Sequence, residues 1–114
     1  MKLQLKPDQH VELLFEPERA GPALDESRIV REARVDDGLL VFVANREVLE
    51  SIRDRISERT KEGRLVWVAY PKAGQLGTDL NRDSLASTLA TNGIKAVRQV
   101  AIDDVWSALR FRPG

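Results

Sequence analysis

Two short apolar runs with one amphipathic segment between them constrain the fold most. Residues 39–44 read LLVFVA and residues 64–70 read RLVWVAY. Short apolar runs of this kind are typical of strands buried on both faces of a parallel sheet. Between them, apolar residues such as Leu49 and Ile52 recur at helical spacing on an otherwise charged surface, which predicts a helix over 46–62. A strand, a helix and a strand in succession imply a parallel pair with a right-handed crossover.

The ends of the predicted helices carry recognisable signals. Asn45 is a candidate N-cap of the first helix, and Gly63 a candidate stop. A second helix is predicted over 80–91. Strands over 95–102 and 105–112 then close the chain, and the connection between them is too short for a parallel crossover, so we expect these two strands to pair antiparallel.

Two further strands are predicted near the N-terminus, over 10–16 and 28–35, and the stretch between them is too short for a full third helix. The whole pattern predicts a single α/β domain over 1–114. We expect a Rossmann-like, mostly parallel sheet of five to six strands with an antiparallel C-terminal strand and two main helices.

Composition excludes several classes of function. Lys+Arg and Asp+Glu both number 18, so the chain has no broad field to attract nucleic acid, and we expect no nucleic-acid partner. Cysteine is absent and His10 is the one histidine, so we expect no metal centre and no cofactor. No apolar run approaches the ~20 residues of a membrane span, and no signal peptide is visible, so we expect a cytoplasmic protein with no membrane partner.

Three sequence segments resemble a known family. They are WVAYPK at 67–72, TDLNRD at 78–83 and WSALRF at 106–111. Together they resemble a family of small bacterial proteins that is catalogued as a domain of unknown function, so this resemblance brings no activity with it. From Asp37 to Phe111 the order of elements also looks like the second half of the class I S-adenosylmethionine methyltransferase fold.

The methyltransferase resemblance lacks the motif that binds the cofactor. Those enzymes place a glycine-rich turn directly after the first strand, where the backbone approaches S-adenosylmethionine closely. Here the corresponding stretch runs from Phe15 to Gly21 as FEPERAG, with a proline inside it and a single late glycine. The resemblance therefore implies the fold without the S-adenosylmethionine site.

The best candidate site follows the strand at 64–70. Lys72 lies just past that strand, and the next helix begins with four polar residues: Asp79, Asn81, Arg82 and Asp83. One interpretation is that Lys72 and Arg82 hold an anionic group at the helix N-terminus. The other, which we favour on sequence alone, is purely structural: Thr78 or Asp79 caps the helix and the bases pair with the acids.

A second candidate pair lies in the last strand. Trp106 and Arg110 share one face of that strand and would form a stacking platform for a ligand ring. The simpler interpretation is that Trp106 is a core aromatic covered by Arg110. Neither interpretation supplies a catalytic group, and we predict no catalytic residue in the chain.

The leading functional hypothesis is a non-catalytic binding or protein-interaction module. The alternative is a small enzyme, or a nucleotide- or anion-binding protein, that uses the strand edge around Lys72 and Arg82. With only two full helices, we also expect one sheet face to be poorly covered, and therefore a homodimer through that face or through an edge strand.

Overall fold

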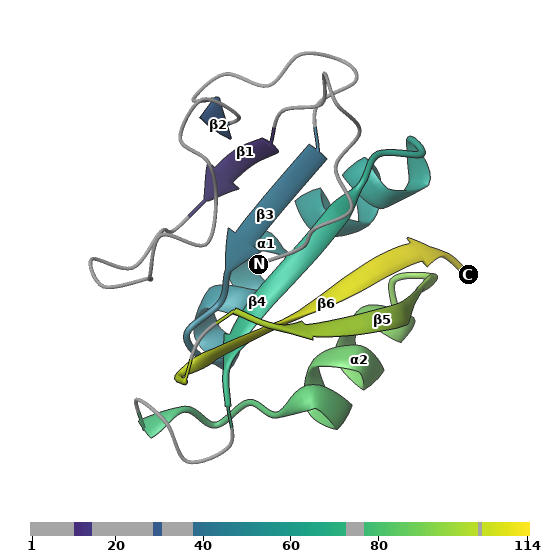
Figure 1. Ribbon diagram of the computed structural model, residues 1–114. Coiled ribbons are helices and arrows are strands. Elements are labelled where there is room, and N and C mark those ends of the chain that lie inside the picture. Colours follow the sequence, from purple (N-terminus) through teal and green to yellow (C-terminus); the bar gives the residue numbers. More distant parts are fainter. Residues whose placement is uncertain (1–10, 15–28, 31–37, 73–76, 103) are drawn as a thin grey trace.

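The computed structural model describes residues 11–14, 29–30, 38–72, 77–102 and 104–114. These residues form one six-stranded sheet, in the order β2-β1-β3-β4-β6-β5, and two helices (Figure 1). In chain order the elements are β1 Val11–Leu14, β2 Ile29–Val30, β3 Gly38–Phe42, α1 Arg46–Lys61, β4 Val66–Pro71, α2 Arg82–Ala90, β5 Ile94–Ala101 and β6 Trp106–Pro113.

The expectation of an α/β domain with two main helices is confirmed. Both helices begin and end within two residues of the predicted bounds. Every residue of β3 and β4 is buried, as predicted from their uninterrupted apolar character. The last two strands pair antiparallel, which the short connection between them required.

The expectation of a Rossmann-like, mostly parallel sheet is wrong, because the sheet is mixed. The strand β6 lies between β4 and β5 and is antiparallel to both. These two antiparallel pairings extend over six and seven residue pairs, whereas the three parallel pairings extend over two, four and four. The tight connection after β5 lets β6 fold back between its neighbours, and local sequence does not reveal that insertion.

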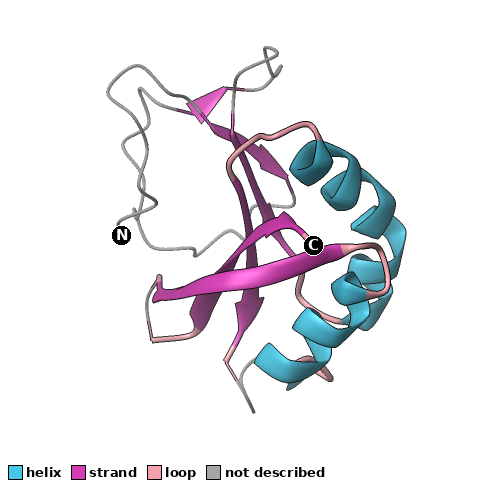
Figure 2. Ribbon diagram, turned by 90° about the vertical axis from the view of Figure 1, so that its right-hand side faces the viewer, coloured by secondary structure: helices cyan, strands magenta, loops and turns pink. Residues whose placement is uncertain are grey.

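Both helices lie on the same face of the sheet (Figure 2). A doubly wound Rossmann sheet carries helices on both faces, so the described residues form a two-layer arrangement instead. The core between the layers joins β-strand residues such as Val41, Val68 and Leu109 to Leu49 of α1 and Leu85 of α2. Figure 1 shows α2 running beneath the β5–β6 hairpin, with α1 behind β3 and β4.

The face of the sheet away from the helices carries a second apolar cluster. Leu40, Phe42, Trp67 and Trp106 belong to it, and each is at most 4% exposed within a single copy of the chain. Phe42 and Trp106 meet edge to face, with ring centroids 5.2 Å apart and an angle of 83° between the rings. The expectation of a homodimer through this face depended on exposed side chains, so the structure does not support it.

Both ends of α1 are capped by local hydrogen bonds. The Asn45 side chain accepts from the backbone N–H of Val48 at 3.0 Å, which confirms Asn45 as the N-cap of α1. At the other end, Gly63 has φ 83°, and its N–H donates to the Thr60 carbonyl at 3.0 Å. The N–H of Arg64 reaches back to the carbonyl of Arg59 at 3.3 Å, which completes a Schellman motif.

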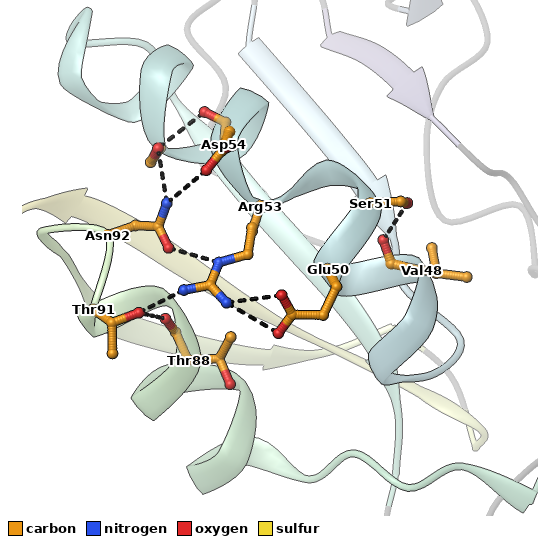
Figure 3. Close-up of polar contacts among 9 residues, drawn as sticks. Val48, Glu50, Ser51, Arg53, Asp54, Thr88, Thr91 and Asn92 are labelled. Carbon is orange, nitrogen blue, oxygen red and sulfur yellow. Dashed lines mark hydrogen bonds and ion pairs between the residues drawn. The ribbon is translucent and has the colours of Figure 1, made fainter.

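A polar cluster fixes the end of α2 to the side of α1 (Figure 3). Arg53 of α1 donates from Nε to Asn92 Oδ1 at 2.9 Å and from Nη2 to Thr91 Oγ1 at 2.6 Å. Its Nη1 also meets the carboxylate of Glu50 at 2.8 Å. In turn, Asn92 Nδ2 donates to Asp54 Oδ1 at 3.2 Å. The cluster therefore holds α2 in place at the end opposite to its N-terminus.

Candidate functional site

A hollow of about 380 Å³ opens where β4 ends. We call it the strand-end hollow, and its described lining residues are Tyr70, Lys72, Asn81, Arg82, Asp83, Gln99 and Ser107. They come from the end of β4, the start of α2, and the β5–β6 hairpin. Since β4 is parallel to β3, this is the carboxyl edge of the parallel part of the sheet, where open α/β sheets commonly bind ligands.

Three hydrogen-bonded side chains form a polar group in the hollow, in which Tyr70 and Ser107 are buried and Gln99 is exposed. Gln99 Nε2 donates to the Tyr70 hydroxyl at 3.0 Å and to Ser107 Oγ at 3.4 Å. The Ser107 hydroxyl donates in turn to the Val100 carbonyl at 3.1 Å. Because Tyr70 and Ser107 are almost fully buried, this network gives their hydroxyls partners that the apolar core cannot supply.

The environment of Tyr70 shifts its ionisation. Burial raises the pKa of the Tyr70 phenol above its ordinary value of 10.0, and this effect outweighs the hydrogen bond with Ser107 and the charge of Arg82, both of which lower the pKa. The charge of Asp83 raises it slightly. At neutral pH the phenol is therefore protonated and keeps its proton available for a hydrogen bond.

The start of α2 forms the rim of the hollow. Asn81 is the N-cap: its side chain accepts from the N–H of Ser84 at 2.9 Å, and Ser84 Oγ accepts from the N–H of Asn81 at 3.0 Å. This reciprocal capping box places Arg82 and Asp83 in the first turn, where backbone N–H groups have no acceptor within the helix. We expected Thr78 or Asp79 as the cap, but the capping residue is Asn81.

The described lining of the hollow carries two cations and one carboxylate. Lys72 follows β4, and its backbone N–H is fixed to the Val105 carbonyl at 2.7 Å. Arg82 meets Asp83 at 3.4 Å, with both side chains mostly exposed, so water screens this pair strongly. No other carboxylate lies among the hollow's described lining residues. The described lining of the strand-end hollow therefore has an excess of positive charge.

The structure brings together four of the seven residues singled out from the sequence: Lys72, Asn81, Arg82 and Asp83. Asp79 lies outside this group. Its Oδ1 accepts from the backbone N–H of Arg46 at 2.9 Å, so it ties the segment before α2 to the start of α1.

Trp106 and Arg110 also lie away from the hollow. Trp106 is 4% exposed and packs on Phe42 in the cluster on the face away from the helices. Arg110 is half-buried on the same face and stands opposite Trp67 in the ladder between β4 and β6.

Sequence reasoning missed Tyr70, Gln99 and Ser107 as lining residues. Tyr70 ends an apolar strand and reads as core. Gln99 reaches the hollow because β5 shifts register between Ala96 and Arg98, which places an extra residue in the strand. Nothing in the sequence marks that irregularity. The tyrosine at the carboxyl end of its strand was the one available signal.

A scan of the chain against protein-family models finds no match, and a search of the curated proteins finds none either. In the part of the chain that the structure describes, no helix is long and apolar enough to cross a membrane. The function of the chain is therefore inferred from the strand-end hollow and from the surface of the sheet.

Proposed function

We propose that this chain is a non-catalytic binding module that holds a small anionic ligand in the strand-end hollow. The observation that carries the proposal is the meeting of Lys72 and Arg82 with the Tyr70 hydroxyl and the start of α2 in one hollow. A volume of about 380 Å³ is within the range of small-molecule sites, roughly 300–1,000 Å³.

Each lining group has a role suited to an anion. Lys72 and Arg82 supply positive charge, and the positive end of the α2 dipole lies at the same rim, because Asn81, Arg82 and Asp83 line the hollow. The protonated Tyr70 hydroxyl is a neutral donor. A phosphate, or a similar multivalent oxyanion, uses charge and several donors at once, so it fits this set better than a neutral molecule.

A binding role fits these groups better than a catalytic one. The Ser107 hydroxyl donates its proton to the Val100 carbonyl, so it is not presented to a base. The side chain of Asp83 is 87% exposed and lies beside Arg82, so no buried environment prepares its carboxylate for acid–base catalysis. S-adenosylmethionine is not an expected ligand, because the stretch after the first strand lacks the required glycines. That stretch lies outside the described residues.

A thermal-shift panel tests the proposal directly, because a ligand that binds the native state raises the melting temperature by mass action. The panel contains inorganic phosphate, pyrophosphate, adenosine diphosphate and S-adenosylmethionine. We expect the phosphate-bearing compounds to stabilise the wild type and S-adenosylmethionine to leave it unchanged. Lys72→Gln should lose the stabilisation, whereas Lys61→Gln, at an exposed lysine of α1, should keep it. No response to any of the anions would refute the proposal.

A further inference from the structure

The two strands of the β5–β6 hairpin carry positive charge and no carboxylate, and the acidic pair Asp103-Asp104 lies in the connection between them. The strands read IKAVRQVA and WSALRFRP, and their four charged residues are Lys95, Arg98, Arg110 and Arg112. The chain as a whole is neutral, with 18 basic and 18 acidic residues. These strands are therefore a local concentration of cations and do not reflect the general composition.

The strand register places these cations opposite one another. Lys95 pairs with Arg112, and Arg98 pairs with Arg110. Directly opposite residues share a face of the sheet, and like charges in such pairs are destabilising. By alternation along β6, this is the face of Ala108, which belongs to the cluster away from the helices. The four cations thus follow one face of the hairpin, on the side opposite α1 and α2.

The register shift in β5 is what creates this row. With strict alternation, Val97 and Gln99 would share a face with Lys95, and Arg98 would face the helices. The extra residue between Ala96 and Arg98 instead turns Arg98 toward the face of Lys95 and turns Gln99 toward Tyr70. A single irregularity therefore serves both the strand-end hollow and the row of cations.

Three of these cations are exposed: Lys95, Arg98 and Arg112. None of the three forms an ion pair within the described part of the chain. Arg110 is half-buried, so the exposed part of the row consists of the other three. An anionic partner that binds beside these opposed cations relieves their mutual repulsion, so its binding is favourable.

The edge of β5 is open as well. Among the described strands it is the outermost of the sheet, pairs only with β6 and is eight residues long, so its other edge offers N–H and C=O groups that no described strand pairs with. Val97 lies on this strand and is 42% exposed, which makes it the one exposed large hydrophobic residue in the described part of the chain. Backbone groups and an apolar contact are what an added strand uses.

We propose that the β5 edge binds an acidic, extended segment of another protein, which adds a strand to the sheet and faces Lys95, Arg98 and Arg112 with its carboxylates. A second copy of this chain fits poorly, because its own β5 would bring cations against cations. Nucleic acid fits poorly too, because single strands stack on exposed aromatic rings, whereas Trp67, Tyr70 and Trp106 are at most 4% exposed.

Fluorescence anisotropy with labelled peptides tests this proposal. The probes are an eight-residue peptide that alternates glutamate with valine, a matched peptide that alternates lysine with valine, and a single-stranded oligothymidylate. We expect the glutamate peptide to bind and the other two to bind at least about tenfold more weakly. Amide exchange should show new protection along β5 when the glutamate peptide is present.

Single substitutions test whether the peptide binds at the cations of β5 and β6 or elsewhere on the molecule. Lys95→Glu and Arg112→Glu should each weaken the glutamate peptide about tenfold or more, and the milder Lys95→Gln should act in the same direction if a reversal disturbs folding. Arg46→Glu, at an exposed cation of α1, and Lys72→Gln, in the strand-end hollow, should leave it unchanged. The proposal is overturned if the β5–β6 variants bind the peptide normally or if the oligothymidylate binds more tightly than the glutamate peptide. It is also overturned if the wild type does not bind the glutamate peptide. Self-association of Lys95→Glu would in that case show that the cations serve only to keep the edge unpaired.

Discussion

Gln99 Nε2 lies 3.0 Å from the Tyr70 hydroxyl and joins an edge strand to the buried end of β4. Tyr70 is the single tyrosine of the chain, so its phenolate absorbance reports the strand-end hollow without a label. Burial raises its pKa above 10.0. We expect an absorbance titration of the folded protein to show a midpoint above that value. An anion bound beside the ring should move the midpoint higher still, because a nearby negative charge disfavours the phenolate. A midpoint at or below 10.0 would mean that Tyr70 is solvated.

The same shift predicts how stability depends on pH. The folded pKa exceeds the unfolded one, so as pH rises the phenol ionises first in the unfolded state. This contribution to the free energy of unfolding is complete below about pH 10 and is lost as pH rises through the folded pKa. Chemical denaturation at a series of alkaline pH values measures it. Tyr70→Phe should show a shallower fall in the same range, and an identical pH profile for the two proteins would contradict the prediction.

Trp67 is fully buried on the sheet face away from the helices. We expect Trp67→Ala to cost about 3–5 kcal/mol of unfolding free energy, because a large cavity remains in the core. Val97→Ala, at an exposed position, should cost only about 0.5 kcal/mol or less. Denaturant titration compares them. A loss below about 1 kcal/mol at Trp67 would show that this face of the sheet is loosely packed.

Asn81 is the N-cap of α2 and also lines the strand-end hollow. Asn81→Ala should cost about 0.5–2 kcal/mol of unfolding free energy, because the hydrogen bond from the Ser84 N–H to the Asn81 side chain is lost. Asn81→Ser can still accept from the helix N–H and should retain most of the stability. If both variants were equally destabilised, the role of Asn81 would lie elsewhere than in the cap.

Arg53 bonds to Asn92 across the two helices and to Glu50 within α1. A double-mutant cycle on Arg53 and Asn92 should give a coupling of about 0.5–3 kcal/mol, because these groups belong to one hydrogen-bonded cluster. The cycle on Arg53 and Glu50 should give only about 0.2–0.5 kcal/mol, as is typical of exposed pairs within a helix. A larger coupling energy for Arg53 and Glu50 than for Arg53 and Asn92 would show that the cluster does not fix α2.

The sequence was sufficient to predict those helices and strands that follow a local pattern of residues. The helical spacing of Leu49 and Ile52 and the caps Asn45 and Gly63 predicted α1, and uninterrupted apolar runs predicted β3 and β4. The position of β6 between β4 and β5 depends on which strand edges meet, and that is a tertiary choice that local patterns do not contain.

The candidate site was predictable in part for the same reason. Lys72 and Arg82 stand where a strand ends and a helix begins, and such positions are readable from sequence. Gln99 reaches Tyr70 only because an extra residue reverses the alternation of β5. A one-residue irregularity moves every later side chain to the other face, so alternation alone would place Gln99 on the face away from Tyr70.

Isothermal titration calorimetry of pyrophosphate into the protein is the decisive experiment for anion binding through Lys72 in the strand-end hollow. We predict one site per chain in the wild type, binding about tenfold weaker or lost in Lys72→Gln, and binding unchanged in Lys61→Gln. Affinity should also fall as salt is raised, because both partners are charged. Equal pyrophosphate affinity in the wild type and Lys72→Gln, or no heat of binding in either, would show that the hollow is not an anion site.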